Sequence, residues 1–286
     1  MPEGPEVCIT AQYLLSILNN KTIKYISNKN YKSIINYKIK DVNTKGKLLW
    51  FTLIKNNLTY YLICHFGLTG EWSFDKNEYN KLIILLNDDT KLYYNDLRNF
   101  GRMLLIKDKI LLDKEINKLA PDFLKTEFTN DEFIEQFKKY MNKTIKRKNM
   151  LLVKVLMDQK AIGSGIGNYL SSEILYNAKL SPKRTLKSLS NNDLKKLSQS
   201  IKYIMKLSYY NNPTGYMTNF DKFILKHKKG IDNGKYPNYH QDIKLKKSDQ
   251  FKFNVYRRKL DNNGNKVLAD KINNNRTTYW IPNIQK

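Results

Sequence analysis

Residues 158–169 read DQKAIGSGIGNY, and this glycine-rich stretch decides how the second half of the chain is interpreted. Its glycines suggest a dinucleotide-binding loop, but Asn168 stands where a G-x-G-x-x-G pattern needs its last glycine. A helical pattern also precedes the stretch, whereas a dinucleotide-binding loop follows a strand. We therefore predict a tight turn into a helix N-terminus, where glycines let the backbone approach a phosphate and free N–H groups bind it.

Helical patterns lie on both sides of this stretch. One covers residues 145–159, and two others begin at candidate capping boxes, 129–132 and 190–193. In a capping box the first and last side chains each bind the other's backbone N–H group, which starts a helix. The second half of the chain is therefore predicted to be mostly α-helical, with a domain boundary near residue 125.

The first half has the pattern of an antiparallel β-sandwich behind a leading helix. Apolar residues at helical spacing over 6–18 predict that helix. The runs 47–54 and 58–64, like the runs 82–86 and 90–94, flank short polar turns and predict hairpins. Several hairpins in series indicate a sandwich, so the predicted fold class is α+β.

The end of the chain predicts a basic β-hairpin. Residues 251–257 and 276–281 have strand composition, and the sequence DNNG at 261–264 lies between them. We expect an N-terminal β-sandwich domain at 1–125, a helical domain at 126–245, and a terminal hairpin at 246–286 that belongs to the second domain.

The charge of the chain points to a polyanionic partner. Lys and Arg number 51 against 26 Asp and Glu, which gives a formal net charge of +25 over 286 residues. Nucleic acid is the usual partner of such a chain, because neutralising phosphates releases counterions. An AT-rich coding sequence also supplies lysines, so charge alone leaves this open.

Neither a disulfide framework nor a four-cysteine zinc site is possible, because the chain has only Cys8 and Cys64. A reducing, intracellular compartment is expected. His65, His227 and His240 are scattered along the sequence, so we predict no metal and no cofactor. The sequence shows neither a cleavable hydrophobic leader nor an apolar run of about 18 residues, which predicts a protein that is neither secreted nor membrane-spanning.

The chain begins MPEGPEV, and removal of Met1 would make Pro2 the first residue. An α-amino group titrates near pH ~7.7–8.0, so a useful fraction is unprotonated at neutral pH. Such an amine attacks an electrophilic sugar carbon and forms a Schiff base. Taken alone, the start of the chain is better explained as a short proline-rich entry into a helix, and the rest of the sequence reverses this preference.

Four motifs occur in sequence: PEGPE at 2–6, GKLL at 46–49, DLRNFG at 96–101 and GIGNY at 165–169. Their residues and order resemble the formamidopyrimidine-DNA glycosylase / endonuclease VIII family, and the likeness covers nearly the whole chain. The resemblance implies a bifunctional DNA repair enzyme with a β-sandwich domain and a helix-two-turn-helix domain. Its partner would be damaged double-stranded DNA, and single-stranded DNA is also possible.

The resemblance assigns roles to matching positions. It implies that Pro2 is the nucleophile, that Glu3 is the general acid/base, and that Lys47 has an accessory catalytic role. Glu6 matches a further acidic position of the family, although a glutamate in a first helical turn also favours the helix dipole.

Further matching positions would bind DNA. Lys160, Asn168 and Arg276 match ligands of the DNA backbone, which position the duplex without reading its sequence. Leu68, Arg98 and Phe100 match the side chains that fill the space left by an extruded nucleotide. The sequence departs from the family pattern at two positions in this void-filling region. Leu68 stands where methionine is common, and Asn99 stands where a second arginine is usual.

The terminal hairpin departs most from the family pattern. Many members have a four-cysteine zinc finger here, whose last strand carries an RTTY-like run before a cysteine. This chain keeps Arg276-Thr277-Thr278-Tyr279, but Ile281 occupies the cysteine position. The hairpin therefore resembles the zincless finger of some animal endonuclease VIII-like enzymes. That likeness favours oxidised pyrimidines and hydantoins over 8-oxoguanine, with base discrimination expected in the pocket and in a loop at 212–235.

Other functions remain open at this point. A DNA-binding module without catalysis would keep Asn168 and Arg276 but would need neither Pro2 nor Glu3. A paralogue specialised for oxidised purines would keep all four residues. A basic RNA-binding or ribosome-associated protein would have no use for the N-terminal motif. We expect a monomeric enzyme that works wherever the DNA is, in the cytoplasm or the nucleus.

Overall fold

The computed structural model describes residues 2–211, 221–246, 248–273 and 276–286. These residues fall into two compact units. The N-terminal unit comes mainly from Met1–Lys118, and the C-terminal unit from Leu119–Thr214 and Ile224–Lys286. The predicted boundaries at 125 and 245 stay predictions.

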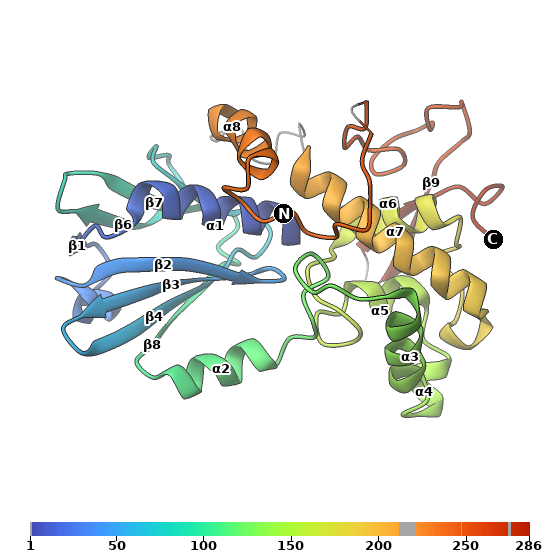
Figure 1. Ribbon diagram of the computed structural model, residues 1–286, viewed down its shortest axis with the longest axis horizontal. Coiled ribbons are helices and arrows are strands. Elements are labelled where there is room, and N and C mark those ends of the chain that lie inside the picture. The colour runs from blue at the N-terminus through green and yellow to red at the C-terminus, as the bar shows by residue number, and fades with distance from the viewer. Residues whose placement is uncertain (1, 212–220, 247, 274–275) are drawn as a thin grey trace. The chain divides into compact units, whose positions relative to one another are not determined.

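The N-terminal unit consists of a leading helix and two four-stranded antiparallel sheets, with the strand orders β2-β3-β4-β8 and β1-β6-β7-β5. The predicted leading helix is α1 (Gly4–Leu18), which packs against β2 (Figure 1). The predicted hairpins are also present, as β3–β4 and β6–β7. The strands of the two sheets have these bounds: β1 Ile23–Ile26, β2 Lys38–Lys45, β3 Leu48–Lys55, β4 Leu58–His65, β5 Gly70–Ser73, β6 Asn80–Leu86, β7 Lys91–Asp96 and β8 Arg102–Ile106.

Side chains from both sheets form the core of this unit. The ring of Trp72 on β5 lies 5.1 Å from that of Phe51 on β3 and 5.1 Å from that of Tyr94 on β7, both edge-to-face. Cys64 is fully buried beside them, and burial raises the pKa of its thiol to about 12. The sandwich prediction is confirmed.

Two further helical segments belong to the N-terminal unit, and the sequence patterns did not predict them. The 3₁₀ helix η1 covers Lys29–Ile34, and α2 covers Lys109–Asn117. Asp108 caps α2, because its carboxylate accepts a hydrogen bond from the N–H of Ile110 at 2.6 Å. Ile110 and Leu111 are exposed, so the helix lacks the continuous apolar stripe from which helices are predicted.

The C-terminal unit is mostly helical. Both predicted capping boxes are present, at the starts of α3 and α7. At the first of them, Glu132 accepts from the N–H of Thr129 at 2.7 Å, and Thr129 accepts in return from the N–H of Glu132. The helices have these bounds: α3 Asn130–Met141, α4 Ile145–Lys148, α5 Leu152–Met157, α6 Asn168–Ala178, η2 Leu186–Ser188, α7 Asn191–Tyr210 and α8 Asp221–Asp232.

The helix predicted over 145–159 is interrupted, so that α4 and α5 replace it. Leu151 has an extended backbone and forms an isolated β-bridge with Thr185. The N–H of Leu152 then bonds to the carbonyl of Arg184 at 2.8 Å. The backbone at 151–152 therefore bonds to the segment 184–185, and this interrupts the helix.

The prediction of a loop at 212–235 is also wrong in part. Helix α8 occupies Asp221–Asp232, and residues 212–220 lie outside the described residues. Its His227 is buried between Tyr209 and Tyr236, and burial lowers the pKa of this imidazole to about 4. No described helix combines the length and the apolar character that a membrane crossing requires.

The terminal hairpin is present, but its first strand was predicted in the wrong place. Strand β9 (Leu268–Asn273) pairs antiparallel with β10 (Arg276–Trp280), whereas residues 251–257 form no strand. Phe251, Phe253 and Tyr256 instead pack their rings 5.5–6.1 Å from the ring of Tyr169 on α6. The alternating aromatic pattern thus reflects packing around a helix.

A buried carboxylate explains why residues 254–256 need no strand partner. Glu173 on α6 is 1% exposed and accepts hydrogen bonds from the N–H groups of Asn254, Val255 and Tyr256 at 2.9–3.0 Å. The side-chain amide of Asn254 gives a fourth bond at 3.0 Å. Burial raises the pKa of this carboxyl, although the four bonds act in the opposite direction.

Replacing this carboxylate should destabilise the protein strongly. In Glu173→Gln an amide N–H₂ would face backbone N–H donors, and each buried unpaired donor costs about 1–3 kcal/mol. We expect urea denaturation to show a free energy of unfolding lower by about 2–4 kcal/mol. Glu135→Gln, at an exposed position on α3, is the control and should change it by less than about 0.5 kcal/mol. Equal effects of the two substitutions would contradict this role of Glu173.

Candidate functional site

The N-terminal motif builds the start of α1. Glu3 is the N-cap residue of the helix, and its N–H donates to Glu6 Oε2 at 2.9 Å, within a capping box formed by these two glutamates. Both are buried, at 1% and 0% exposure, whereas Pro2 is partly exposed. The motif therefore holds Pro2 next to a buried carboxylate at a fixed helix start, and Glu6 has a clear structural role there.

Lys47 lies in a two-residue turn. Lys45 of β2 pairs with Leu48 of β3, so Gly46 and Lys47 alone connect the strands. Gly46 has φ +56°, the left-handed conformation that glycine adopts without strain at the first central position of such a turn. The turn places Lys47 at the tip of a rigid hairpin.

The two loops with the predicted void-filling residues are brought together. One follows β4 and carries Leu68, and the other follows β7 and carries Arg98 and Phe100. A Cβ atom on Gly67, which has φ +60°, would lie 2.6 Å from the carbonyl carbon of Phe100, so this close approach requires glycine. Phe100 and Arg98 are exposed, and Leu68 is partly exposed.

Asp96, a residue with no predicted role, ties these loops to each other. It is 1% exposed. Its Oδ1 accepts from the hydroxyl of Thr69 at 2.5 Å, and its Oδ2 accepts from the N–H of Gly101 at 2.7 Å. The Thr69 hydroxyl in turn accepts from the N–H of Arg98 at 3.0 Å. The sequence shows only that an acid begins the DLRNFG motif, and its role becomes visible in the fold.

Removing Asp96 should loosen both loops. Asp96→Ala leaves the N–H of Gly101 and the hydroxyl of Thr69 without their acceptor, which should lower the free energy of unfolding by about 2–3 kcal/mol. Urea denaturation measures this loss. Asp96→Asn can direct its oxygen to Gly101 and its amide to Thr69, so it should recover most of the stability. Equal defects in the two variants would contradict this role.

The glycine-rich stretch forms the predicted turn. Gln159 braces it: its side-chain amide donates to the carbonyl of Ile166, and its Oε1 accepts from the N–H of Gly165, both at 2.8 Å. Gly165 has φ +106°, and α6 begins directly afterwards at Asn168. The expected tight turn into a helix N-terminus is confirmed, and Gln159 is a bracing residue that had no predicted role.

Asn168 and Arg276 come from distant parts of the sequence but meet at strand β10. The Asn168 amide nitrogen donates to the carbonyl of Thr277 at 2.9 Å. Arg276, the neighbour of Thr277, is exposed at the first position of β10. Lys160 is also exposed, in the turn before α6. In the structure Asn168 thus fastens the hairpin to the helical turn, beside an exposed arginine.

The hairpin does not fit a cysteine-bound zinc ion. Both cysteines of the chain, Cys8 and Cys64, lie in the N-terminal unit. Val255, Val267 and Ile281 form a small apolar cluster, and Tyr279 of β10 packs against it.

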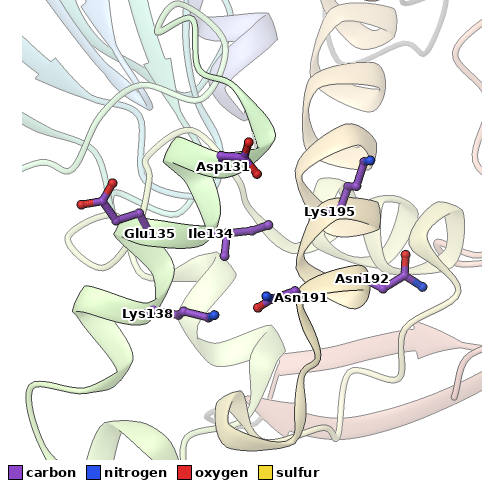
Figure 2. A pocket seen from close by; sticks show the side chains of 7 residues that line it. All are labelled: Asp131, Ile134, Glu135, Lys138, Asn191, Asn192 and Lys195. Atoms are coloured by element: carbon purple, nitrogen blue, oxygen red, sulfur yellow. The ribbon is translucent and has the colours of Figure 1, made fainter.

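One pocket of the C-terminal unit lies apart from the predicted residues. Figure 2 shows it between α3 and α7, with Ile134 and Asn191 facing each other across it. It has a volume of about 500 Å³. Its lining mixes charges of both signs and includes none of the predicted site residues: Asp131, Ile134, Glu135, Lys138, Asn191, Asn192 and Lys195.

Solved structures show the same fold. MutM (Fpg) from Thermus thermophilus matches with a TM-score of 0.76 and 22% identity, over 99% of this chain and 98% of that one. Lactococcus lactis Fpg, in complex with DNA containing an oxidised pyrimidine, matches with a TM-score of 0.76 and 20% identity over all of both chains. These likenesses confirm the predicted fold class.

Sequence comparison gives the family. The models described as the N-terminal, H2TH and C-terminal domains of formamidopyrimidine-DNA glycosylase match residues 1–103, 119–218 and 241–286. The formamidopyrimidine-DNA glycosylase of Ureaplasma parvum serovar 3 is 35% identical over 75% of this chain and 80% of its own length. The formamidopyrimidine-DNA glycosylase of Wolbachia pipientis wMel is 30% identical over 71% of this chain and 76% of its own length. This chain therefore belongs to the formamidopyrimidine-DNA glycosylase family, as its four motifs predicted.

Proposed function

We propose that this protein is a DNA glycosylase of base excision repair that also has AP lyase activity. The observation that carries the proposal is the start of the chain, where Pro2 directly precedes a helix capped by the buried Glu3. Family membership supports the same function. A binding module without catalysis would need neither residue.

The proposed reaction begins once Met1 has been removed. The Pro2 nitrogen attacks C1′ of the damaged nucleotide, and the bond from C1′ to the base breaks. Glu3 supplies the proton that the departing base needs and takes part in later proton transfers. The resulting Schiff base makes the neighbouring C–H bond acidic, so β-elimination expels the 3′ phosphate and δ-elimination the 5′ phosphate. The product is a one-nucleotide gap.

The DNA contacts follow from two groups of residues. We assign Lys160, Asn168 and Arg276 to the phosphate backbone, and Lys47 to a phosphate beside the lesion. The target nucleotide must leave the base stack, which costs a few kcal/mol. Leu68, Arg98 and Phe100 would fill the vacated space, and their loops are tied together through Asp96. The proposed enzyme acts as a monomer on double-stranded DNA.

For the substrate we propose oxidised pyrimidines and hydantoins in preference to 8-oxoguanine. Two observations support this preference. The hairpin has no cysteines, and the void-filling region has the smaller side chains Leu68 and Asn99. An oxidised-purine specialist is the alternative, and the family name of the relatives favours it. Borohydride trapping on duplexes with thymine glycol, 5-hydroxyuracil, a hydantoin or 8-oxoguanine ranks the substrates. Binding to all four without trapping or nicking would refute the catalytic proposal.

The role of Arg276 predicts a change in salt dependence. Arg276→Gln should weaken binding to damaged and undamaged duplexes about equally and should lower the slope of log K against log salt by about 1. Fluorescence anisotropy at several salt concentrations measures this slope. Lys196→Gln on the exposed face of α7 removes the same charge and is the control. An unchanged slope for Arg276→Gln would remove this arginine from the DNA interface.

A further inference from the structure

Three side chains from distant parts of the sequence converge in the C-terminal unit. One oxygen each of Glu127 and Asp242 and one ring nitrogen of His240 all lie within 4.8 Å of one another. Residues 123–127 precede α3, and residues 240–242 follow α8. The proposed glycosylase reaction uses none of them.

One hydrogen bond of the His240 ring shows which of its nitrogens carries a proton. Nε2 lies 2.7 Å from the carbonyl oxygen of Phe123. A carbonyl only accepts, so Nε2 carries a proton. In neutral imidazole the lone pair is then on Nδ1, which is the nitrogen that turns toward Glu127. A metal-binding histidine has this arrangement, with its second nitrogen donating to a backbone carbonyl.

Nδ1 itself has no hydrogen-bond partner. It is buried in a side chain with 0% exposure. Glu127 Oε2 lies 3.3 Å from it, without forming a hydrogen bond. Glu127 is held in this orientation because its Oε1 accepts from the N–H of His240 at 2.6 Å. A buried ring nitrogen and a carboxylate oxygen thus face each other at a distance that one cation can bridge.

The spacing suits a divalent cation. Zinc–nitrogen and zinc–oxygen bonds of about 2.0–2.2 Å in a tetrahedron separate neighbouring ligand atoms by roughly 3.4 Å. The distance from Nδ1 to Glu127 Oε2 is close to this value. The side chain of Asp242 is 53% exposed, so its rotation can bring an oxygen to the same point. Glu127 and Asp242 also line a pocket of about 720 Å³ from which water can supply a fourth ligand.

We propose that Glu127, His240 and Asp242 form a binding site for a zinc-like divalent cation. The ion would fasten residues 240–242 to residues 123–127 and so stabilise the C-terminal unit. This site has no relation to the cysteine finger of the family, because it uses one imidazole and two carboxylates.

Two lysines of α7 lie beside this site, and one of them contacts a proposed ligand. Lys202 forms a salt bridge with Asp242 Oδ2 and also donates to the carbonyl of Phe128 at 3.3 Å, so its ammonium competes with a cation for Asp242. Lys206 donates to the carbonyls of His240 and Ile243, and burial lowers the pKa of its ammonium. Lys202 is therefore the residue whose removal should tighten binding.

Titration of the chelator-treated full chain with Zn²⁺, and with Co²⁺ for its absorption spectrum, tests the proposal. We expect one equivalent of Zn²⁺ per chain and a Co²⁺ spectrum typical of nitrogen and oxygen ligands, with no binding of Mg²⁺ at the same concentration. Zn²⁺ should raise the melting temperature of the wild-type protein.

Variants distinguish this site from adventitious binding. His240→Gln keeps a donor for Phe123 but removes Nδ1, and it should weaken Zn²⁺ binding at least a hundredfold. Glu127→Gln and Asp242→Asn, at more exposed positions, should each weaken it about tenfold or more. Lys202→Met should tighten it severalfold. His65→Gln changes an exposed histidine of the other unit and should leave the binding unchanged.

Two outcomes of these measurements would overturn the proposal. Absence of stoichiometric Zn²⁺ binding, or binding unaffected by Glu127→Gln and Asp242→Asn, would overturn it and would leave a histidine–carboxylate contact without a metal as the explanation of this cluster. Because Glu127 and Asp242 are exposed, their variants give this answer even if His240→Gln does not fold. Base excision is measured separately, and its loss or retention has no bearing on the outcome.

Discussion

Blocking the Pro2 nitrogen should abolish covalent trapping of damaged DNA. A chain with one additional, unprocessed residue before Pro2 has a tertiary amide at that position, and the amide lone pair is delocalised into the carbonyl group. Such a nitrogen cannot attack C1′. We expect borohydride trapping and strand nicking to fall by at least about a thousandfold, since the proposed reaction passes through a covalent intermediate on this nitrogen.

Binding to DNA should survive this change. The residues that we assign to the phosphate backbone, Lys160, Asn168 and Arg276, all belong to the C-terminal unit and are unaltered. An anisotropy measurement on a duplex with a stable abasic-site analogue should therefore give nearly the same dissociation constant for blocked and native chains. Release of the extra residue by a site-specific protease should restore trapping. Full trapping by the blocked chain would exclude Pro2 as the nucleophile.

Glu3→Gln should separate the two steps of the reaction. Loss of a general acid/base costs about 10²–10⁴-fold, so removal of a damaged base should slow by that factor. Pro2 keeps its amine, so a Schiff base with a preformed abasic site should still form and should still be trapped. Single-turnover assays on a lesion duplex and on an abasic duplex measure the two steps independently.

The fold has to be checked in this experiment, because Glu3 also caps α1. Glutamine keeps a side-chain oxygen that can accept a hydrogen bond, and thermal melts report whether the helix start is intact. Glu78→Gln, an exposed glutamate in the same unit, is the control and should be fully active. Equal losses on the lesion and abasic duplexes, or wild-type rates on both, would contradict the assignment of Glu3.

Local signals in the sequence predicted much of the fold. The capping boxes at 129–132 and 190–193 begin α3 and α7, because their side chains satisfy helix N–H groups without any help from distant residues. The hairpins β3–β4 and β6–β7 have short polar turns between apolar strands. The turn at 163–167 needs glycine conformations, so it was also visible in the sequence.

Features that depend on distant partners could not be predicted. Residues 251–257 alternate like a strand, but Tyr169 and Glu173, about 80 positions earlier, determine their conformation. The true partner of β10 is β9, a polar segment with the sequence LADKIN and little strand character. The roles of Asp96 and of the pair Glu127 and His240 likewise appear only once the chain is folded.

The proposed mechanism joins the first nitrogen of the processed chain to deoxyribose. Mass spectrometry of the tryptic peptides from the borohydride-trapped complex tests it most directly. We predict that the N-terminal peptide begins at Pro2, lacks Met1 and carries the reduced sugar on its proline nitrogen. An active protein that retains Met1, or an adduct located on a lysine side chain, would contradict the account.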